Sequence, residues 1–184
     1  ETDTQASVDH CGGCGRPCRI ANGAGRCDLG TCRVATCTAP FADCNNNPAD
    51  GCETNLSTDP RSCGRCGARC EPPNAVGVCT AGACRVLSCV GNVGDCNGNP
   101  ADGCEVDTTT TLAHCGMCGS ACAPTNATGA CVASACTVAA CNTGFADCDR
   151  SVTNGCEVDV RTSAANCGVC GRACAAGQTC QGGV

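Results

Sequence analysis

The stretch Cys63–Cys70 reads Cys-Gly-Arg-Cys-Gly-Ala-Arg-Cys, and it decides the fold of the chain. Its three cysteines are spaced by glycines, which accept positive φ angles, so the block predicts a compact turn and not a helix. The same pattern, Cys-Gly-x-Cys-Gly-x-x-Cys, begins again at Cys11, Cys115 and Cys167, always 52 residues from the neighbouring block. The chain is therefore a series of repeats.

The other cysteines keep the same period, which divides the chain into repeats at residues 1–52, 53–104 and 105–156 and a partial fourth repeat at 157–184. We number the eight cysteines of a repeat from first to eighth. They are Cys11, Cys14, Cys18, Cys27, Cys32, Cys37, Cys44 and Cys52; then Cys63, Cys66, Cys70, Cys79, Cys84, Cys89, Cys96 and Cys104; then Cys115, Cys118, Cys122, Cys131, Cys136, Cys141, Cys148 and Cys156; and, in the partial repeat, Cys167, Cys170, Cys174 and Cys180. Because the pattern reaches both edges, we expect a segment of a longer array.

The composition excludes a conventional hydrophobic core. Leu, Ile, Val and Phe together number 22 of 184 residues, Trp and Tyr are absent, and cysteine alone contributes 28. Such a chain needs covalent or metal crosslinks to fold. The net charge of −6 argues against nucleic acid as a partner, and no apolar run is long enough to span a membrane.

Two states of sulfur are open, disulfides and a metal–thiolate cluster. We favour disulfides for all 28 cysteines, because the number is even and each repeat could close its cysteines within itself. Pairs such as Cys63 and Cys66 have zinc-ligand spacing, but the Cys-x-Cys and Cys-Cys pairs of dense thiolate clusters are absent. Eight cysteines allow 105 pairings, so the connectivity stays open. Disulfides predict an extracellular or cell-surface location.

The predicted fold class is a small disulfide-rich tandem repeat of short β-hairpins, turns and coil, with little or no helix, forming an elongated array. The stretch Val76–Leu87 predicts a hairpin with Gly82 in its turn and a cysteine on either side. The segments Cys27–Cys32 and Cys131–Cys136 repeat it, although Ser134 replaces the glycine.

Each repeat also has an acidic, Asn-rich loop around its seventh and eighth cysteines. Oxygen side chains at alternate positions, then a glycine and a glutamate, are the ligand types of a calcium loop. The alternative is that Asp and Asn cap turns by accepting hydrogen bonds from nearby backbone amides. The candidate ligands are Asp43, Asn45, Asn47, Asp50 and Glu53; Asp95, Asn97, Asn99, Asp102 and Glu105; and Asp147, Asp149, Asn154 and Glu157. No other cofactor is expected.

The remaining candidates are weaker. Asn55 and Asn126 stand in the Asn-x-Ser/Thr pattern of glycan acceptors. His10 and His114 precede the first cysteine of their repeats, but Ser62 and Asn166 replace them elsewhere, which favours solvated turn residues over catalytic bases. No Ser–His or Cys–His set recurs, so we expect that the protein is not an enzyme.

The stretch Asn166–Cys180, Asn-Cys-Gly-Val-Cys-Gly-Arg-Ala-Cys-Ala-Ala-Gly-Gln-Thr-Cys, resembles the stigma-specific cysteine-rich domain family of plants. The full 52-residue repeat is similar to tandem cysteine-rich repeats in secreted proteins of myxobacteria and related bacteria. Both resemblances imply an extracellular protein with disulfides. Neither supplies catalytic residues.

These observations predict an extracellular structural protein whose repeats form or decorate a surface fibre or filament. Its expected partners are identical or neighbouring repeats. The alternative is a secreted binding or adhesion module that recognises a receptor or a glycan through its exposed loops. Thiolate metal storage is a third and weaker alternative.

Overall fold

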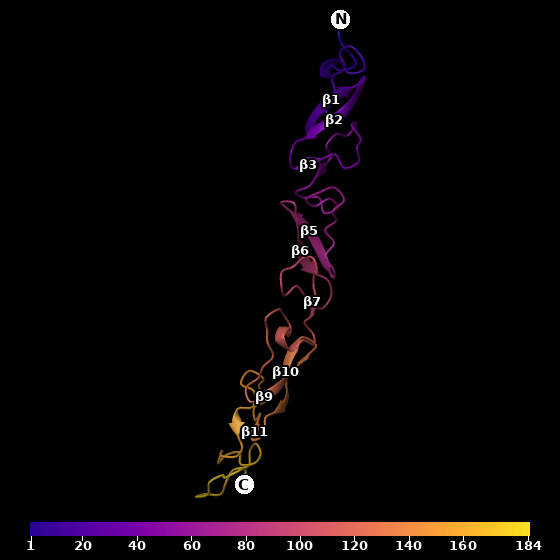
Figure 1. Ribbon diagram of the computed structural model, residues 1–184. Helices are drawn as coiled ribbons and strands as arrows, with labels where there is room; N and C mark the ends of the chain where they lie inside the picture. Colours follow the sequence, from indigo (N-terminus) through magenta and orange to yellow (C-terminus); the bar gives the residue numbers. More distant parts are fainter. The chain divides into compact units, whose positions relative to one another are not determined.

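The computed structural model describes all residues from 1 to 184 and contains six two-stranded antiparallel sheets. Helix is limited to two single 3-10 turns, so the prediction of short hairpins with little helix is confirmed (Figure 1). The longer strands are β1 (Gly23–Asp28), β2 (Thr31–Cys37), β5 (Ala75–Thr80), β6 (Ala83–Cys89), β9 (Ala127–Val132) and β10 (Ala135–Cys141). The two-residue strands are β3 (Phe41–Ala42), β4 (Thr54–Asn55), β7 (Val93–Gly94), β8 (Val106–Asp107), β11 (Phe145–Ala146) and β12 (Val158–Asp159), and the 3-10 turns are η1 (Val8–His10) and η2 (Leu112–His114).

Each full repeat has one long hairpin closed by a two-residue turn. In the first repeat both turn residues, Leu29 and Gly30, have positive φ, of 49° and 73°. This is the type I′ geometry that matches the twist of antiparallel strands. In the third repeat Ala133 and Ser134 take the same conformation, at 51° and 68°. The predicted hairpins are therefore present, and the serine adopts the conformation that its glycine equivalents have.

Thirteen disulfides follow one repeated pattern. The first cysteine bonds the fourth, the third bonds the fifth and the sixth bonds the eighth, as in Cys11–Cys27, Cys18–Cys32 and Cys37–Cys52. The seventh cysteine bonds the second cysteine of the next repeat: these crossing disulfides are Cys44–Cys66, Cys96–Cys118 and Cys148–Cys170. The repeats therefore do not close all of their cysteines within themselves, although their even number would allow it.

Two cysteines predicted to form disulfides, Cys14 and Cys174, are unpaired. Cys14 is a second cysteine, and its equivalents Cys66, Cys118 and Cys170 each bond a seventh cysteine 22 residues earlier in the chain. Cys174 is a third cysteine, and its equivalents Cys18, Cys70 and Cys122 each bond a fifth cysteine 14 residues later in the chain.

The buried interior consists almost entirely of sulfur. Ile20, Pro72 and Val160 are buried with the cysteines, and the eighth cysteines Cys52, Cys104 and Cys156 are completely inaccessible. The facing cysteines of the hairpin, Cys27 and Cys32, lie opposite one another in the register but bond the preceding turn block instead. The disulfides therefore hold this block against the end of the hairpin.

Glycine is required where the turn block meets the hairpin. A Cβ on Gly64 would lie 2.6 Å from the carbonyl oxygen of Gly82 in the hairpin turn, and its φ is +78°. The equivalent contact in the partial repeat joins Gly168 to Gly183. There, Gln181 and Val184 exchange backbone hydrogen bonds of 3.1 and 3.2 Å around Gly182 and Gly183. The partial repeat thus forms the tip of the same hairpin with a different sequence.

The chain divides into two compact units, one of residues 1–88 and 98–103 and the other of residues 89–97 and 104–184. Every disulfide lies within one of the two units. The structure contains no helix with the length and apolar character needed to cross a bilayer.

Candidate functional site

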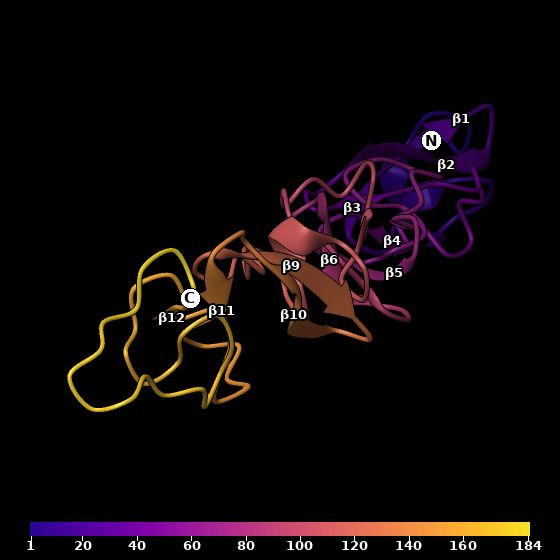
Figure 2. The same cartoon turned by 90° about the horizontal axis from the view of Figure 1, so that it is seen from below.

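The junction between successive repeats is the most elaborate feature of the structure. At the first junction, β3 of one repeat pairs with β4 of the next, with Phe41 opposite Asn55 and Ala42 opposite Thr54. The crossing disulfide Cys44–Cys66 closes the same junction. β7 with β8 and β11 with β12 form the equivalent sheets, and the pair of β11 and β12 is labelled in Figure 2. Hydrogen bonds and a covalent bond therefore both cross each boundary between repeats.

A backbone relay connects this small sheet to the turn block. The N–H of Leu56 donates to the carbonyl of Pro40 in the preceding repeat (2.9 Å), and the carbonyl of Leu56 accepts from Gly64 (2.9 Å). Thr108 makes the same two hydrogen bonds at the second junction, with distances of 3.1 and 2.9 Å. Val160 makes them at the third junction, with distances of 3.0 and 2.8 Å. The position of one repeat is thus fixed against the last segment of the repeat before it.

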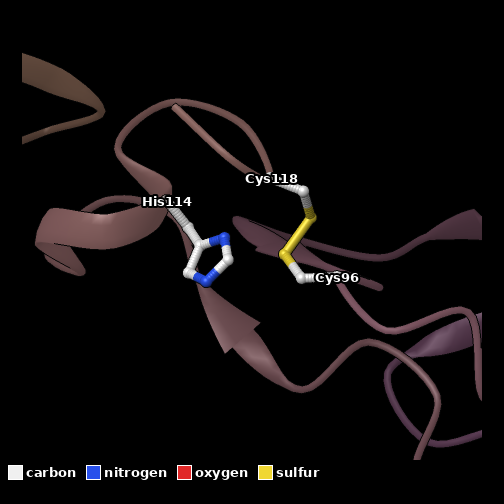
Figure 3. Close-up of side chains that lie close together, drawn as sticks. All are labelled: Cys96, His114 and Cys118. Carbon is white, nitrogen blue, oxygen red and sulfur yellow. A yellow bond between two sulfur atoms is a disulfide. The ribbon is translucent and has the colours of Figure 1, made fainter. Parts of the chain in front are cut away.

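The residue before the first cysteine caps the turn block in all four repeats. His114 Nδ1 accepts a hydrogen bond from the N–H of Gly119 (2.9 Å), and the ring lies beside the disulfide Cys96–Cys118 (Figure 3). Ser62 Oγ and Asn166 Oδ1 accept the equivalent bonds at 3.2 and 2.7 Å, and His10 does so at 2.8 Å. The sequence alone indicated only solvated turn residues at this position. All four side chains carry a hydrogen-bond acceptor, and this shared property is the signal from which the capping role could have been predicted.

One potential metal-ligand atom from each of His114, Cys96 and Cys118 lies within 4.8 Å of the other two. These residues nevertheless do not form a thiolate site. Both cysteine sulfurs are committed to a disulfide, and the histidine nitrogen that faces them accepts the Gly119 N–H. With 26 cysteines in disulfides, only Cys14 and Cys174 are left as thiols. The disulfide interpretation of the sequence is therefore confirmed for 26 of the 28 cysteines.

The third junction carries an additional ionic contact. Arg161 forms a salt bridge with Asp159 (2.9 Å) and lies over the ring of Phe145, 5.4 Å from its centroid. Hydrogen bonds from the Arg161 side chain and backbone lower the pKa of Asp159 below its ordinary value. Hydrogen bonds from Thr109 and Thr110 likewise lower the pKa of Asp107 at the second junction.

In the acidic, Asn-rich loops, the side-chain oxygens accept hydrogen bonds from backbone amides of the same loop. In the first repeat, Asp43 accepts from the N–H of Asn46 (2.6 Å), and Asn45 accepts from that of Asn47 (2.7 Å). Asn47 accepts from Ala49, and Glu53 accepts from the N–H of Cys44 (3.1 Å). Glu105 and Glu157 make the same bond to Cys96 and Cys148, and Asn99 caps Ala101. These contacts are those of the turn-capping alternative.

An amide–carboxylate pair closes the loop, and its two members exchange places between repeats. The Asn45 amide donates to Asp50 (2.9 Å) in the first repeat, whereas the Asn154 amide donates to Asp149 (3.0 Å) in the third. This bond and the Ser151 N–H lower the pKa of Asp149. The exchange keeps the hydrogen bond and the same two side-chain types, one amide and one carboxylate.

The third loop brings oxygens of Asp147, Asp149 and Glu157 within 4.8 Å of one another. All three also accept backbone hydrogen bonds, with Asp147 bonded to Arg150. Asp95, Asn97 and Asp102 of the second repeat likewise have interaction partners. Calcium binding by these loops stays a prediction.

The two candidate glycan acceptors differ in their surroundings. The Asn126 side-chain amide donates to the carbonyl of Cys156 (3.2 Å) from a backbone with a φ of +50°, and Asn22 bonds Cys52 in the same way. A glycan on Asn126 would have to share the nitrogen that anchors the eighth cysteine. Asn55 accepts a bond from the N–H of Ser57 through its oxygen, so its nitrogen is not used in this contact. The geometry favours Asn55 as the acceptor.

The surface hollow at the first junction has a volume of about 410 Å³ and is lined by Pro40, Phe41, Leu56 and small residues. None of its lining side chains is titratable. No family model, no curated protein and no solved structure matches this chain.

Proposed function

We propose that this protein is an extracellular structural array whose repeats are joined by disulfides and build or decorate a surface fibre. The carrying observation is the crossing disulfide, which recurs three times between a seventh cysteine and the second cysteine of the following repeat. The density of disulfides is typical of oxidising compartments, which supports a location outside the cell.

The crossing disulfide gives the junction two covalent paths. Between Cys44 and Cys66 the repeats are connected by the main chain and also by the sulfur bridge. A single proteolytic cut in the connector that follows β4 would leave the two repeats attached. Load applied along the chain would likewise be shared between the main chain and the disulfide. These properties suit a fibre exposed to proteases and mechanical stress.

The function needs neither a cofactor nor a catalytic site. The histidines cap turns, and the acidic side chains hydrogen-bond their own loops, so each is explained by stabilisation of the repeat. Association with identical or neighbouring repeats is the expected partner interaction. Recognition of a receptor or glycan would use the connectors, which differ between repeats while the cysteines stay fixed.

Electron microscopy of material purified from the native source tests the proposal. Fibres, or filaments decorated at regular intervals, are expected in preparations kept free of reductant, and dithiothreitol should disperse them. Compact separate particles under both conditions would refute the structural function. Limited proteolysis adds a second readout: cut chains should migrate as one band without reductant and as fragments with it.

A further inference from the structure

The disulfides form two groups that differ in their exposure to solvent. In each of the ten disulfides within a repeat, at least one of the two cysteines is buried, with no more than 8% of its surface exposed. None of the six cysteines in the three crossing disulfides is buried. Cys66 and Cys118 are the only disulfide-bonded cysteines that are exposed. The sulfur atoms of the crossing disulfides are therefore the easiest for a solute to reach.

The place of the second cysteine in the turn block explains its exposure. The first glycine of the block packs against the hairpin turn, where a Cβ on Gly64 would lie 2.6 Å from the carbonyl oxygen of Gly82. The second glycine, Gly67, directly follows Cys66, and a Cβ there would meet no atom within 4 Å. The equivalent glycines of the next two repeats are equally open. One side of the block is thus covered by the hairpin, and the second cysteine lies on the uncovered side.

We propose that the three crossing disulfides are sites of thiol–disulfide exchange with low-molecular-weight thiols, which uncouple and recouple neighbouring repeats while every disulfide within a repeat stays intact. Exposed disulfides are the labile and regulatory ones in proteins, whereas attack on a buried sulfur first requires local opening of the fold. Reduction of a crossing disulfide leaves the main chain as the only covalent connection between the two repeats. The thiols around the protein then control how the repeats are coupled.

The exchange has two steps, which we describe for the first junction. A small thiolate attacks the exposed sulfur of Cys66, forms a mixed disulfide there and expels Cys44 as a thiolate, which takes up a proton. A second small thiolate attacks the small-molecule sulfur of the mixed disulfide and expels the Cys66 thiolate, which is protonated in turn. Overall, two small thiols lose two electrons and two protons and become one small disulfide, and the protein disulfide becomes two thiols.

Contacts other than the disulfide hold the two cysteines of a junction near each other. β3 pairs with β4, and Glu53 accepts the N–H of Cys44 (3.1 Å). On the other side, Ser62 accepts the N–H of Gly67, the residue after Cys66 (3.2 Å). Because these contacts remain when the bridge opens, the two thiols stay close together and the same bond re-forms on oxidation.

The inference rests on the proposed array function, because it concerns the bonds that join the repeats. Its experiment reads the bonding state of single cysteines in the isolated chain and not the formation of a fibre, so the two can fail separately. In the folded full chain, Cys14 and Cys174 are first blocked with iodoacetamide. Reduced glutathione is then added for increasing times, new thiols are trapped with N-ethylmaleimide, and the labelled cysteines are mapped by mass spectrometry.

The disulfides Cys44–Cys66 and Cys96–Cys118 should be labelled at least about tenfold faster than any disulfide within a repeat, because the latter open only with the fold around them. Early mixed disulfides with glutathione should form on Cys66 and Cys118. Cys148–Cys170 should follow more slowly, because neither of its cysteines is as exposed as Cys66. Equally fast labelling of the disulfides within repeats, or simultaneous opening of all thirteen, would overturn the proposal.

Two further measurements test whether the coupling is separable and reversible. In the double variant Cys44→Ser with Cys66→Ser, the disulfides within the first two repeats should be labelled at their wild-type rates; faster labelling would show that an open junction unfolds the repeats, which overturns the proposal. After partial reduction of the wild-type chain, oxidised glutathione should restore Cys44–Cys66. Recovery of these cysteines with other partners would overturn the recoupling.

Discussion

Removal of one crossing disulfide tests whether the junction is an independent element. In the double variant Cys44→Ser and Cys66→Ser, the link between the first two repeats is lost, whereas the hairpins keep their own disulfides. The control variant, Cys18→Ser with Cys32→Ser, removes a disulfide within the first repeat. Sequence separations of 22 and 14 residues correspond to loop-closure contributions of about 3.4 and about 3.0 kcal/mol. The two variants therefore lose similar amounts of stability but at different places.

Native-state hydrogen exchange followed by mass spectrometry locates the loss. About 3.4 kcal/mol corresponds to at most a roughly 300-fold fall in protection, expected at β3, β4 and the Leu56 amide. The hairpins β1–β2 and β5–β6 should keep their protection in the junction variant, whereas β1–β2 should lose it in the control. Uniform loss over both repeats in the junction variant would refute the reasoning, because the junction would then not unfold separately from the hairpins.

Four further predictions concern individual contacts. Ser62→Ala removes the acceptor of the Gly67 N–H and should cost about 1 kcal/mol in guanidinium unfolding, whereas Ser62→Asn should cost much less; equal losses would contradict the capping role. Gly64→Ala should destabilise more than Gly67→Ala, because both have positive φ but only the first Cβ meets a backbone oxygen, at 2.6 Å; similar unfolding midpoints would argue against this close contact. An NMR pH titration of Asp159 should give a midpoint below its ordinary value of 3.8, because the folded state favours the carboxylate. Its contribution to stability is therefore present above the unfolded-state pKa and is lost as the pH falls through the lower folded value, and an unshifted midpoint would exclude it. Millimolar calcium should leave the thermal unfolding midpoint unchanged if the acidic loops only cap turns; a rise on calcium addition that chelation reverses would instead establish a calcium site.

Most local structure was predictable because turn chemistry is encoded by neighbouring residues. The hairpin around Gly82 follows from an alternating segment, a small turn residue and two flanking cysteines, and the turn block follows from its glycines. The acidic loops were recognisable as recurrent oxygen-rich segments. Their hydrogen bonds were not, because Asp and Asn side chains serve metal ions and backbone amides with the same atoms.

The sequence by itself determined the period, the reliance on sulfur and the helix-poor hairpin class, because composition and spacing are properties of the chain and need no knowledge of contacts. Only the tertiary structure decided which cysteines are partners. Two sulfurs bond when the fold brings them together, and the seventh cysteine meets the second cysteine of the next repeat because β3 pairs with β4 beside them. The pairing of these strands across the repeat boundary, and not the even number of cysteines in a repeat, determines that neighbouring repeats are covalently joined.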